Sequence, residues 1–229
     1  MTETGGAPAL RSGRAAVEEL AERVGAALAE GGTHPVSGGT QARAGQDPSA
    51  LAAVRVLGPD LFAPTALAGA PPHPADRAVA EEALRIFPAP SDALHAVWRD
   101  TAVHRLCGRR VPSPASPLRE EDTWRQYSAH LAAAAPLALP GLDTPFTASA
   151  AGRAPDVARG TVRAMLRGDH PTAARLARWL ALTGPGRNVP ALDLCALLDH
   201  IDLHTPGART AVDTAIARRL LFARPGTVA

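Results

Sequence analysis

The chain has 229 residues, of which 46% are hydrophobic, and its mean hydropathy is −0.04, so it can form one sizeable domain or two small ones. This composition excludes collagen-like chains, pure coiled coils and strongly charged disordered chains. All 24 basic residues are Arg and the formal net charge is only +2. Because a GC-rich coding bias also replaces Lys by Arg, the Arg content alone does not indicate nucleic-acid binding.

The composition also restricts the core. Only 3% of the residues are aromatic, whereas 22 are Pro and 20 are Gly, so the core must consist mostly of Ala, Leu and Val, and small side chains favour close packing of helices. No segment alternates convincingly as a strand, and residues 51–58 (LAAVRVLG) fit a helix better. The sequence predicts an all-α bundle of about seven to eight helices with an irregular, Pro/Gly-rich N-terminal third.

The first predicted helix covers residues 13–30, because Val17, Leu20 and Val24 recur at helical spacing. Residues 31–46 are rich in Gly, Ser, Thr and Gln and have little to bury, which is typical of a flexible linker. We therefore divide the chain into an N-terminal helix plus linker (1–46) and a helical domain (47–229).

The second region contains a short predicted helix at 48–57, an irregular Pro-rich segment at 58–74, and then regular helices. Their N-termini carry Pro, Ser or Asp, and Gly or Pro follows several of their C-termini, as expected for helix boundaries. The predicted helices are 75–87, 92–107, 117–135, 155–167, 171–183, 190–204 and 206–224. Residues 137–152 are expected to form a Pro- and Gly-containing loop.

Cysteine usage and hydropathy bear on location. Cys107 and Cys195 lie in apolar helical contexts without a CxxC motif, which favours reduced packing thiols in a cytoplasmic protein. No apolar run approaches the ~18 residues that a membrane helix needs. The first residues lack the apolar core of a signal peptide. We therefore expect no membrane partner.

The near-neutral charge is unevenly distributed. Residues 1–149 carry 13 Arg and 16 acidic residues, whereas residues 150–229 carry 11 Arg and 6 acidic residues. The basic C-terminal third can face phosphates, although a modest excess of charge over several helices can equally be a solvated exterior.

Arginines recur at one-turn spacing in this basic third. An array of guanidinium groups about 6 Å apart can follow a phosphate backbone, and the alternative is a solvated surface written in Arg through coding bias. The candidate nucleic-acid contacts are Arg159, Arg163, Arg167, Arg175, Arg178, Arg209, Arg218 and Arg219.

A metal site is the second chemical candidate. His200 and His204 are separated by four residues and share a helix face. They need a third ligand, for which His130 and His170 are the candidates, because Asp193 lies about 10 Å away along the axis. The alternative places His204 at a helix C-terminus, where the helix dipole favours it, and His200 in solvent.

Other catalytic patterns are weak. His95 and His104 lie on opposite faces of one predicted helix, and Cys107 ends that helix, where the dipole raises the pKa of a thiol. GxSxG, Walker and GxGxxG motifs are absent from the sequence. We therefore expect no catalytic residues and no cofactor, and we favour a binding function over an enzyme.

Two family resemblances follow from the motifs. Residues 199–204 (DHIDLH) resemble the His-bearing helix of the DinB-like and maleylpyruvate isomerase families, four-helix bundles that hold a divalent metal with three ligands. That resemblance implies a metal-dependent helical-bundle enzyme that uses His200 and His204.

Residues ~119–224 resemble the small subunit of the type I-E CRISPR Cascade complex, the CasB family. The resemblance rests on REEDTWRQYSAHLAA, on VRAMLRGDHPTAARLARWLALTG and on VPALDLCALLDHIDLHTPGARTAVDTAIARRLLFAR. It implies a catalytically inert all-α subunit, present in two copies, that contacts guide RNA and single- or double-stranded DNA through backbone phosphates. The eight arginines named above would make these contacts, alongside other subunits of the assembly and with possible self-association.

Three hypotheses therefore stand: a nucleic-acid-binding subunit, a metal-dependent DinB-like enzyme, and a helical accessory or interaction protein without chemistry of its own.

Overall fold

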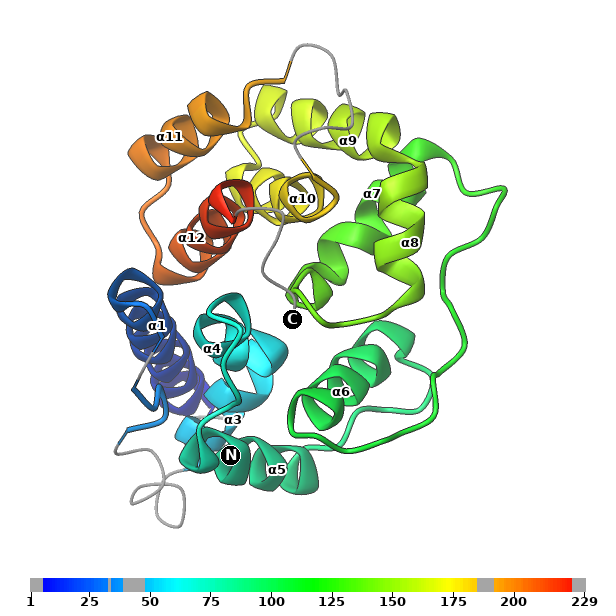
Figure 1. The fold of residues 1–229 in the computed structure, drawn as a ribbon. Helices are drawn as coiled ribbons and strands as arrows, with labels where there is room; N and C mark the ends of the chain where they lie inside the picture. Colours follow the sequence, from blue (N-terminus) through cyan, green and yellow to red (C-terminus); the bar gives the residue numbers. More distant parts are fainter. Residues whose placement is uncertain (1–5, 33, 39–47, 185–191, 224–229) are drawn as a thin grey trace, which may run out of the picture.

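The regular elements of the chain are helices. The computed structural model describes residues 6–32, 34–38, 48–184 and 192–223, and within these ranges it has α- and 3₁₀-helices and no strand. The expected all-α class is confirmed, and these ranges hold more helices than the seven to eight expected. In Figure 1 helix α10 (His170–Leu182) lies among its neighbours α7, α9 and α12, and the N-terminal α1 lies beside the C-terminal α12.

Helix α1 (Gly6–Glu30) begins before the expected residue 13 and belongs to the main core. Its buried Leu20, Val24 and Leu28 face α12 (Ala208–Phe222) and α3 (Pro48–Leu57). After α1, Val36 is also buried. The expected boundary near residue 47 therefore does not separate two cores, and residues 39–47 of the predicted linker lie outside the described residues.

The segment 58–74 was expected to be irregular, and its first half is helical and buried. A 3₁₀ turn η1 (Gly58–Phe62) continues into the short helix α4 (Ala63–Leu67), and both are almost fully enclosed. Pro59 and Pro64 sit in the first turns of these elements, where a missing N–H costs nothing. The prediction of an irregular segment is wrong for residues 58–67, because Pro59 and Pro64 begin helical elements instead of ending them.

The same region is the one described segment that is long and apolar enough to cross a membrane. The apolar stretch within Pro48–Leu67 has a mean hydropathy of 1.3, and 67% of it is buried inside the protein. The expectation that no apolar run approaches the length of a membrane helix is therefore wrong for this segment, which has 20 residues. Asp60 at its centre binds a buried Arg (below), so this segment serves as a core element in the structure.

Helices α5 (Pro74–Ile86) and α6 (Leu94–Leu106) match the predicted segments closely. Helix α7 (Trp124–Ala133) begins later than the expected residue 117. Its start is set by a capping box, in which the Thr123 hydroxyl accepts from the Gln126 amide and the Gln126 side chain accepts from the Thr123 amide. The acidic residues 120–122 therefore precede the helix and do not form its first turn.

The C-terminal helices follow a turn η2 (Ala135–Leu137) and a helix α8 (Pro145–Gly152), which the sequence reading took as loop. Helices α9 (Ala154–Leu166), α10 and α12 lie within two residues of their predicted bounds. Helix α11 (Leu194–His204) begins after the expected residue 190, and residues 190–191 lie outside the described residues.

Candidate nucleic-acid interface

Helix α9 presents a row of arginines to solvent. Its Val157, Thr161 and Ala164 are buried, and the helical period therefore places Arg163 and Arg167 outside, where both are exposed. Arg159 is also exposed and contacts Asp156 at 3.4 Å. Within the described part of the chain, neither Arg163 nor Arg167 has a carboxylate at ion-pair distance, so both guanidinium groups are available to an anionic ligand.

A groove of about 210 Å³ runs between α9, the start of α7 and the start of α10. Its polar rim holds three arginines, Arg125, Arg163 and Arg167, against one carboxylate, Asp169. Its other lining residues are small or apolar apart from two hydroxyl-bearing side chains: Trp124, Ser128, Ala129, Gly160, Ala164, Thr172 and Leu176. The groove is therefore both cationic and aromatic.

Trp124 is the aromatic member of this groove and is half-buried. The guanidinium carbon of Arg125 lies 5.1 Å from its ring centroid, and that of Arg163 lies 5.9 Å away. These distances are within the range of cation–π attraction, but they are looser than the 4.1 Å between Arg153 and the Tyr127 ring. The Trp124 ring is therefore approached by two guanidinium groups without being tightly covered by either.

Gly160 allows the close approach of α7 and α9 that forms the floor of the groove. A Cβ atom at this position would overlap the Ser128 side chain and lie 3.2 Å from Leu176. The Ser128 hydroxyl donates to the Trp124 carbonyl at 2.7 Å and lies 3.3 Å from the Asp156 carbonyl. Residues of three helices thus fix the position of the first turn of α7.

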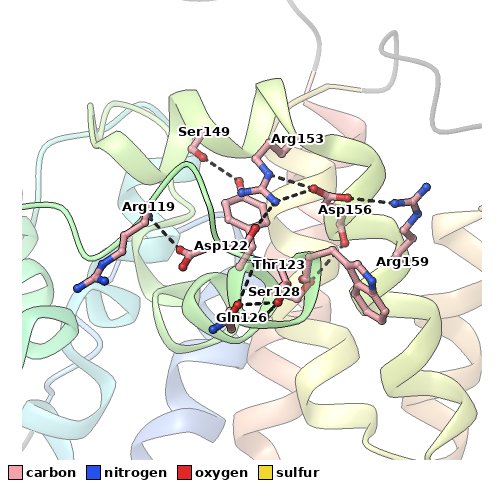
Figure 2. A network of polar contacts seen from close by, with 11 residues as sticks. Arg119, Asp122, Thr123, Gln126, Ser128, Ser149, Arg153, Asp156 and Arg159 are labelled. Carbon is pink, nitrogen blue, oxygen red and sulfur yellow. Dashed lines mark hydrogen bonds and ion pairs between the residues drawn. The ribbon is translucent and has the colours of Figure 1, made fainter.

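A polar network holds the same turn from the other side, as Figure 2 shows. Arg153 donates to Asp156 Oδ2 at 3.0 and 2.8 Å and to the Asp122 carbonyl at 2.9 Å. Ser149 of α8 donates to the Tyr127 hydroxyl at 3.1 Å. Because the loop before α7 is tied to α8 and α9, Trp124 and Arg125 are held beside the α9 arginines.

Arg178 is a correction to the predicted contact set, because its side chain is fully buried. It donates to Asp213 at 2.7 Å and to Asp60 at 2.8 Å. Burial raises the pKa of Asp60, but Arg178 and Arg209 outweigh this and hold it below its usual range. A phosphate cannot reach this guanidinium group, which instead joins α10 to α12 and η1.

The remaining predicted arginines are partly engaged with the protein. Arg175 lies 3.8 Å from Asp213, and Arg209 lies 3.6 Å from Asp60. Arg218 bridges Asp199 and Asp202 at 2.8 Å each, and Arg219 donates to the Leu28 carbonyl. They do not line the groove, so among the described residues Arg163 and Arg167 are the members of the predicted set without a carboxylate or carbonyl partner.

The histidines of the predicted metal site lie together: His200 and His204 are joined by His170, one of the two candidates for a third ligand. The rings of His200 and His204 stack at 4.1 Å, and the His170 ring lies 5.5 and 6.1 Å from them. His170 Nδ1 contacts the Thr205 hydroxyl at 2.6 Å, and His204 Nδ1 contacts the His200 carbonyl at 2.8 Å. No group of three His, Cys, Asp or Glu among the described residues is arranged to hold a metal ion.

The structure also contains a histidine pair that the sequence did not predict. His95 of α6 and His130 of α7 stack at 5.1 Å, with 3.1 Å between His95 Nε2 and His130 Nδ1. Burial, and secondarily His130, lowers the pKa of His95. The two residues are 35 positions apart, and no short-range spacing indicates that they meet.

Comparison with known proteins adds no relative: no family model matches the chain, and neither a curated protein nor a solved structure resembles it significantly.

Proposed function

We propose that this protein is a helical subunit that binds the phosphate backbone of a nucleic acid, with the α9 row and Arg125 as its main contacts. The observation that carries the proposal is the pair of exposed, carboxylate-free guanidinium groups of Arg163 and Arg167 beside Arg125. Guanidinium groups bind phosphate oxygens in a bidentate manner, and successive turns of a helix present them about 6 Å apart.

The resemblance of residues ~119–224 to the CasB family supports a finer version of this proposal, in which the backbone belongs to guide RNA or target DNA in a CRISPR surveillance-type assembly. The groove lies within this part of the chain. In such an assembly the sequence is read by base pairing, and a small subunit contributes backbone contacts.

The test is a fluorescence-anisotropy titration of labelled single- and double-stranded DNA between roughly 50 and 200 mM salt. The variant Arg163→Ala/Arg167→Ala is expected to bind at least about tenfold more weakly at the lower salt, and to reduce the slope of log K against log salt by about 1.4 on single strands. Binding that is absent at low salt, or insensitive to salt, would refute the proposal.

The matched control is Arg110→Ala/Arg119→Ala, which removes the same charge from exposed arginines outside the groove that have no carboxylate at ion-pair distance within the described residues. We expect it to change binding by less than about threefold, because loss of net charge alone acts only through the screened long-range field. Equal losses in the two double variants would show that general charge, and not this interface, binds the nucleic acid.

A further inference from the structure

Within the proposed phosphate-binding surface, we infer that the groove at Trp124 is a stacking site for one unpaired nucleobase, so that the interface selects single-stranded over double-stranded nucleic acid. This inference rests on the proposed function, and it adds a ligand class that phosphate contacts alone do not define. It depends on three properties of the groove: its aromatic wall, its size and the arrangement of its cations.

The aromatic wall is available to a ligand. Trp98 and Trp179 are 1% and 0% exposed and their indole N–H groups are bonded to carbonyls, so both belong to the core. Trp124 is the remaining Trp and is half-buried at the edge of the groove, and its indole N–H has no hydrogen-bond partner within the described residues. Aromatic side chains on surfaces that bind single strands serve as platforms on which bases stack.

The groove has the size of a subsite for a single ring. Its volume of about 210 Å³ is below the roughly 300 to 1,000 Å³ of pockets that enclose drug-sized ligands. It is lined by Gly160, Ala129 and Ala164, whose small or absent side chains leave room beside the indole. A flat base fits this space, whereas its sugar and phosphate would remain outside.

The cations lie where the flanking phosphates would be. Arg163 and Arg167 follow each other on one side of the groove, and Arg125 stands next to Trp124 on the other. Arg163 lies 5.9 Å from the indole centroid, and because its side chain is exposed, a movement of about 1 Å would admit a base between the two groups at ordinary stacking distances. Arg would then complete the stack through its planar face.

A paired base cannot enter this groove, because both of its faces are covered by neighbouring base pairs. With phosphate contacts alone, the affinities for single and double strands would differ only through the charge density of the two forms. Base stacking at Trp124 would therefore appear as a preference for single strands that depends on the presence of bases.

The experiment compares the full-length protein with Trp124→Ala and Trp124→Phe on three probes of equal length: oligothymidylate, an abasic oligomer with the same phosphates, and duplex DNA. Trp124→Ala should weaken oligothymidylate binding by about fivefold to a hundredfold, and it should leave the abasic and duplex affinities unchanged. Trp124→Phe should restore most of the lost affinity, since a smaller ring can still stack.

Tryptophan fluorescence provides an independent measurement. Because the other two Trp residues are buried, oligothymidylate should quench the emission of the natural protein and not that of Trp124→Phe, and the abasic oligomer should quench neither. Far-UV circular dichroism and thermal unfolding of each variant check that the fold is retained, and Trp124→Phe keeps the test valid if Trp124→Ala does not fold.

The outcomes separate the two proposals. Equal affinity for oligothymidylate and the abasic oligomer, with both weakened by Arg163→Ala/Arg167→Ala, would overturn base stacking and leave phosphate binding in place. If the protein bound none of the three probes, both the phosphate-binding and the base-stacking proposals would be overturned. Quenching by an acidic peptide such as polyglutamate, with an affinity equal to that of oligothymidylate, would show that the groove recognises negative charge without recognising a base.

Discussion

Cys107 and Cys195 are the two thiols of the chain and differ sharply in exposure: Cys107 is buried and Cys195 is exposed. Neither forms a disulfide, but only Cys107 is the packing thiol that the sequence reading expected. Burial raises the pKa of the Cys107 thiol to about 11. Cys107 is therefore both closed to reagents and disfavoured as the reactive thiolate, whereas Cys195 is open to solvent.

An aromatic disulfide reagent is expected to modify Cys195 rapidly at about pH 8 and to leave Cys107 unmodified until the chain is unfolded. Counting released thiolate before and after addition of denaturant gives the measurement, and Cys195→Ser is the control that should remove the rapid phase. Rapid reaction of two thiols in the native protein would contradict the burial of Cys107.

Arg178 is a fully buried charge that lies between two buried carboxylates, Asp60 and Asp213. Replacing Arg178 by Met would leave Asp60 and Asp213 without their main partner. We expect a loss of about 3 to 5 kcal/mol in the free energy of unfolding, measured by urea denaturation.

Two further variants test the cause of this loss. The exposed Arg159–Asp156 pair offers a surface control, and Arg159→Ala should cost less than about 1 kcal/mol. Replacing both carboxylates as well, as Arg178→Met/Asp60→Asn/Asp213→Asn, should recover part of the lost stability, because the two buried carboxylates then carry no unpaired charge. The recovery should be incomplete, since Arg209 loses its contact with Asp60. A loss with Arg178→Met as small as that with Arg159→Ala would contradict a stabilising role for the contacts that join α10 to α12 and η1.

At the scale of elements, the contact between α7 and α9 depends on the absence of a side chain at Gly160. Gly160→Ala should destabilise the protein by about 1 to 3 kcal/mol because the added methyl group forces the helices apart. The matched control is Gly25→Ala in α1, where a Cβ meets nothing within 4 Å and helix propensity predicts a gain of up to about 1 kcal/mol. Thermal unfolding of the two variants should therefore shift in opposite directions, and a shift of both in the same direction would contradict this packing.

Helices α6 and α7 are linked by the His95–His130 pair, which makes their contact sensitive to pH. The lowered pKa of His95 means that the unfolded chain, with a value near 6.5, binds a proton more readily than the folded chain does. The contribution of His95 to stability is therefore present above about pH 6.5 and is lost as the pH falls through the folded-state pKa. The urea midpoint should decrease between pH 7.5 and about 5, and His95→Gln should reduce that decrease; an identical profile in the variant would rule out His95 as its source.

At the scale of the molecule, the two ends of the chain stabilise each other. The buried face of α1 packs on α12, Glu18 accepts from the Ala208 amide at 2.9 Å, and Arg219 donates to the Leu28 carbonyl. A chain that begins after α1 would expose this side of α12 together with buried residues of α3.

Deletion of the residues up to Glu30 should therefore abolish cooperative unfolding and expose apolar surface. Calorimetry and binding of an apolar dye measure these effects, and Leu20→Ala/Val24→Ala in the full chain is a milder version that should lower the melting temperature without preventing folding. A sharp unfolding transition in the truncated protein would restore the division into two units that the linker-like sequence suggested.

The sequence predicted much of the secondary structure of the second half, because helical periodicity, caps and Pro at helix starts are local signals. It failed where these signals were ambiguous: Pro59 and Pro64 start buried elements instead of ending them, and the start of α7 is set by the Thr123–Gln126 box. It also identified the α9 arginine row as a phosphate-binding candidate. It did not identify Trp124 and Arg125 as their neighbours, because that proximity depends on how α7 crosses α9.

The uneven distribution of charge and the all-Arg composition belong to the sequence alone, and so does the regular spacing of Arg159, Arg163 and Arg167. Only the tertiary structure decided which arginines remain free. Arg178 lies about one turn along α10 from Arg175, yet the packing of α10 against α12 and η1 places it between two carboxylates, whereas Arg163 and Arg167 stay exposed at the groove between α9, α7 and α10. The physical reason is that helical spacing determines which residues share a face, whereas burial and pairing depend on contacts between segments as distant as Asp60 and Arg178, 118 positions apart.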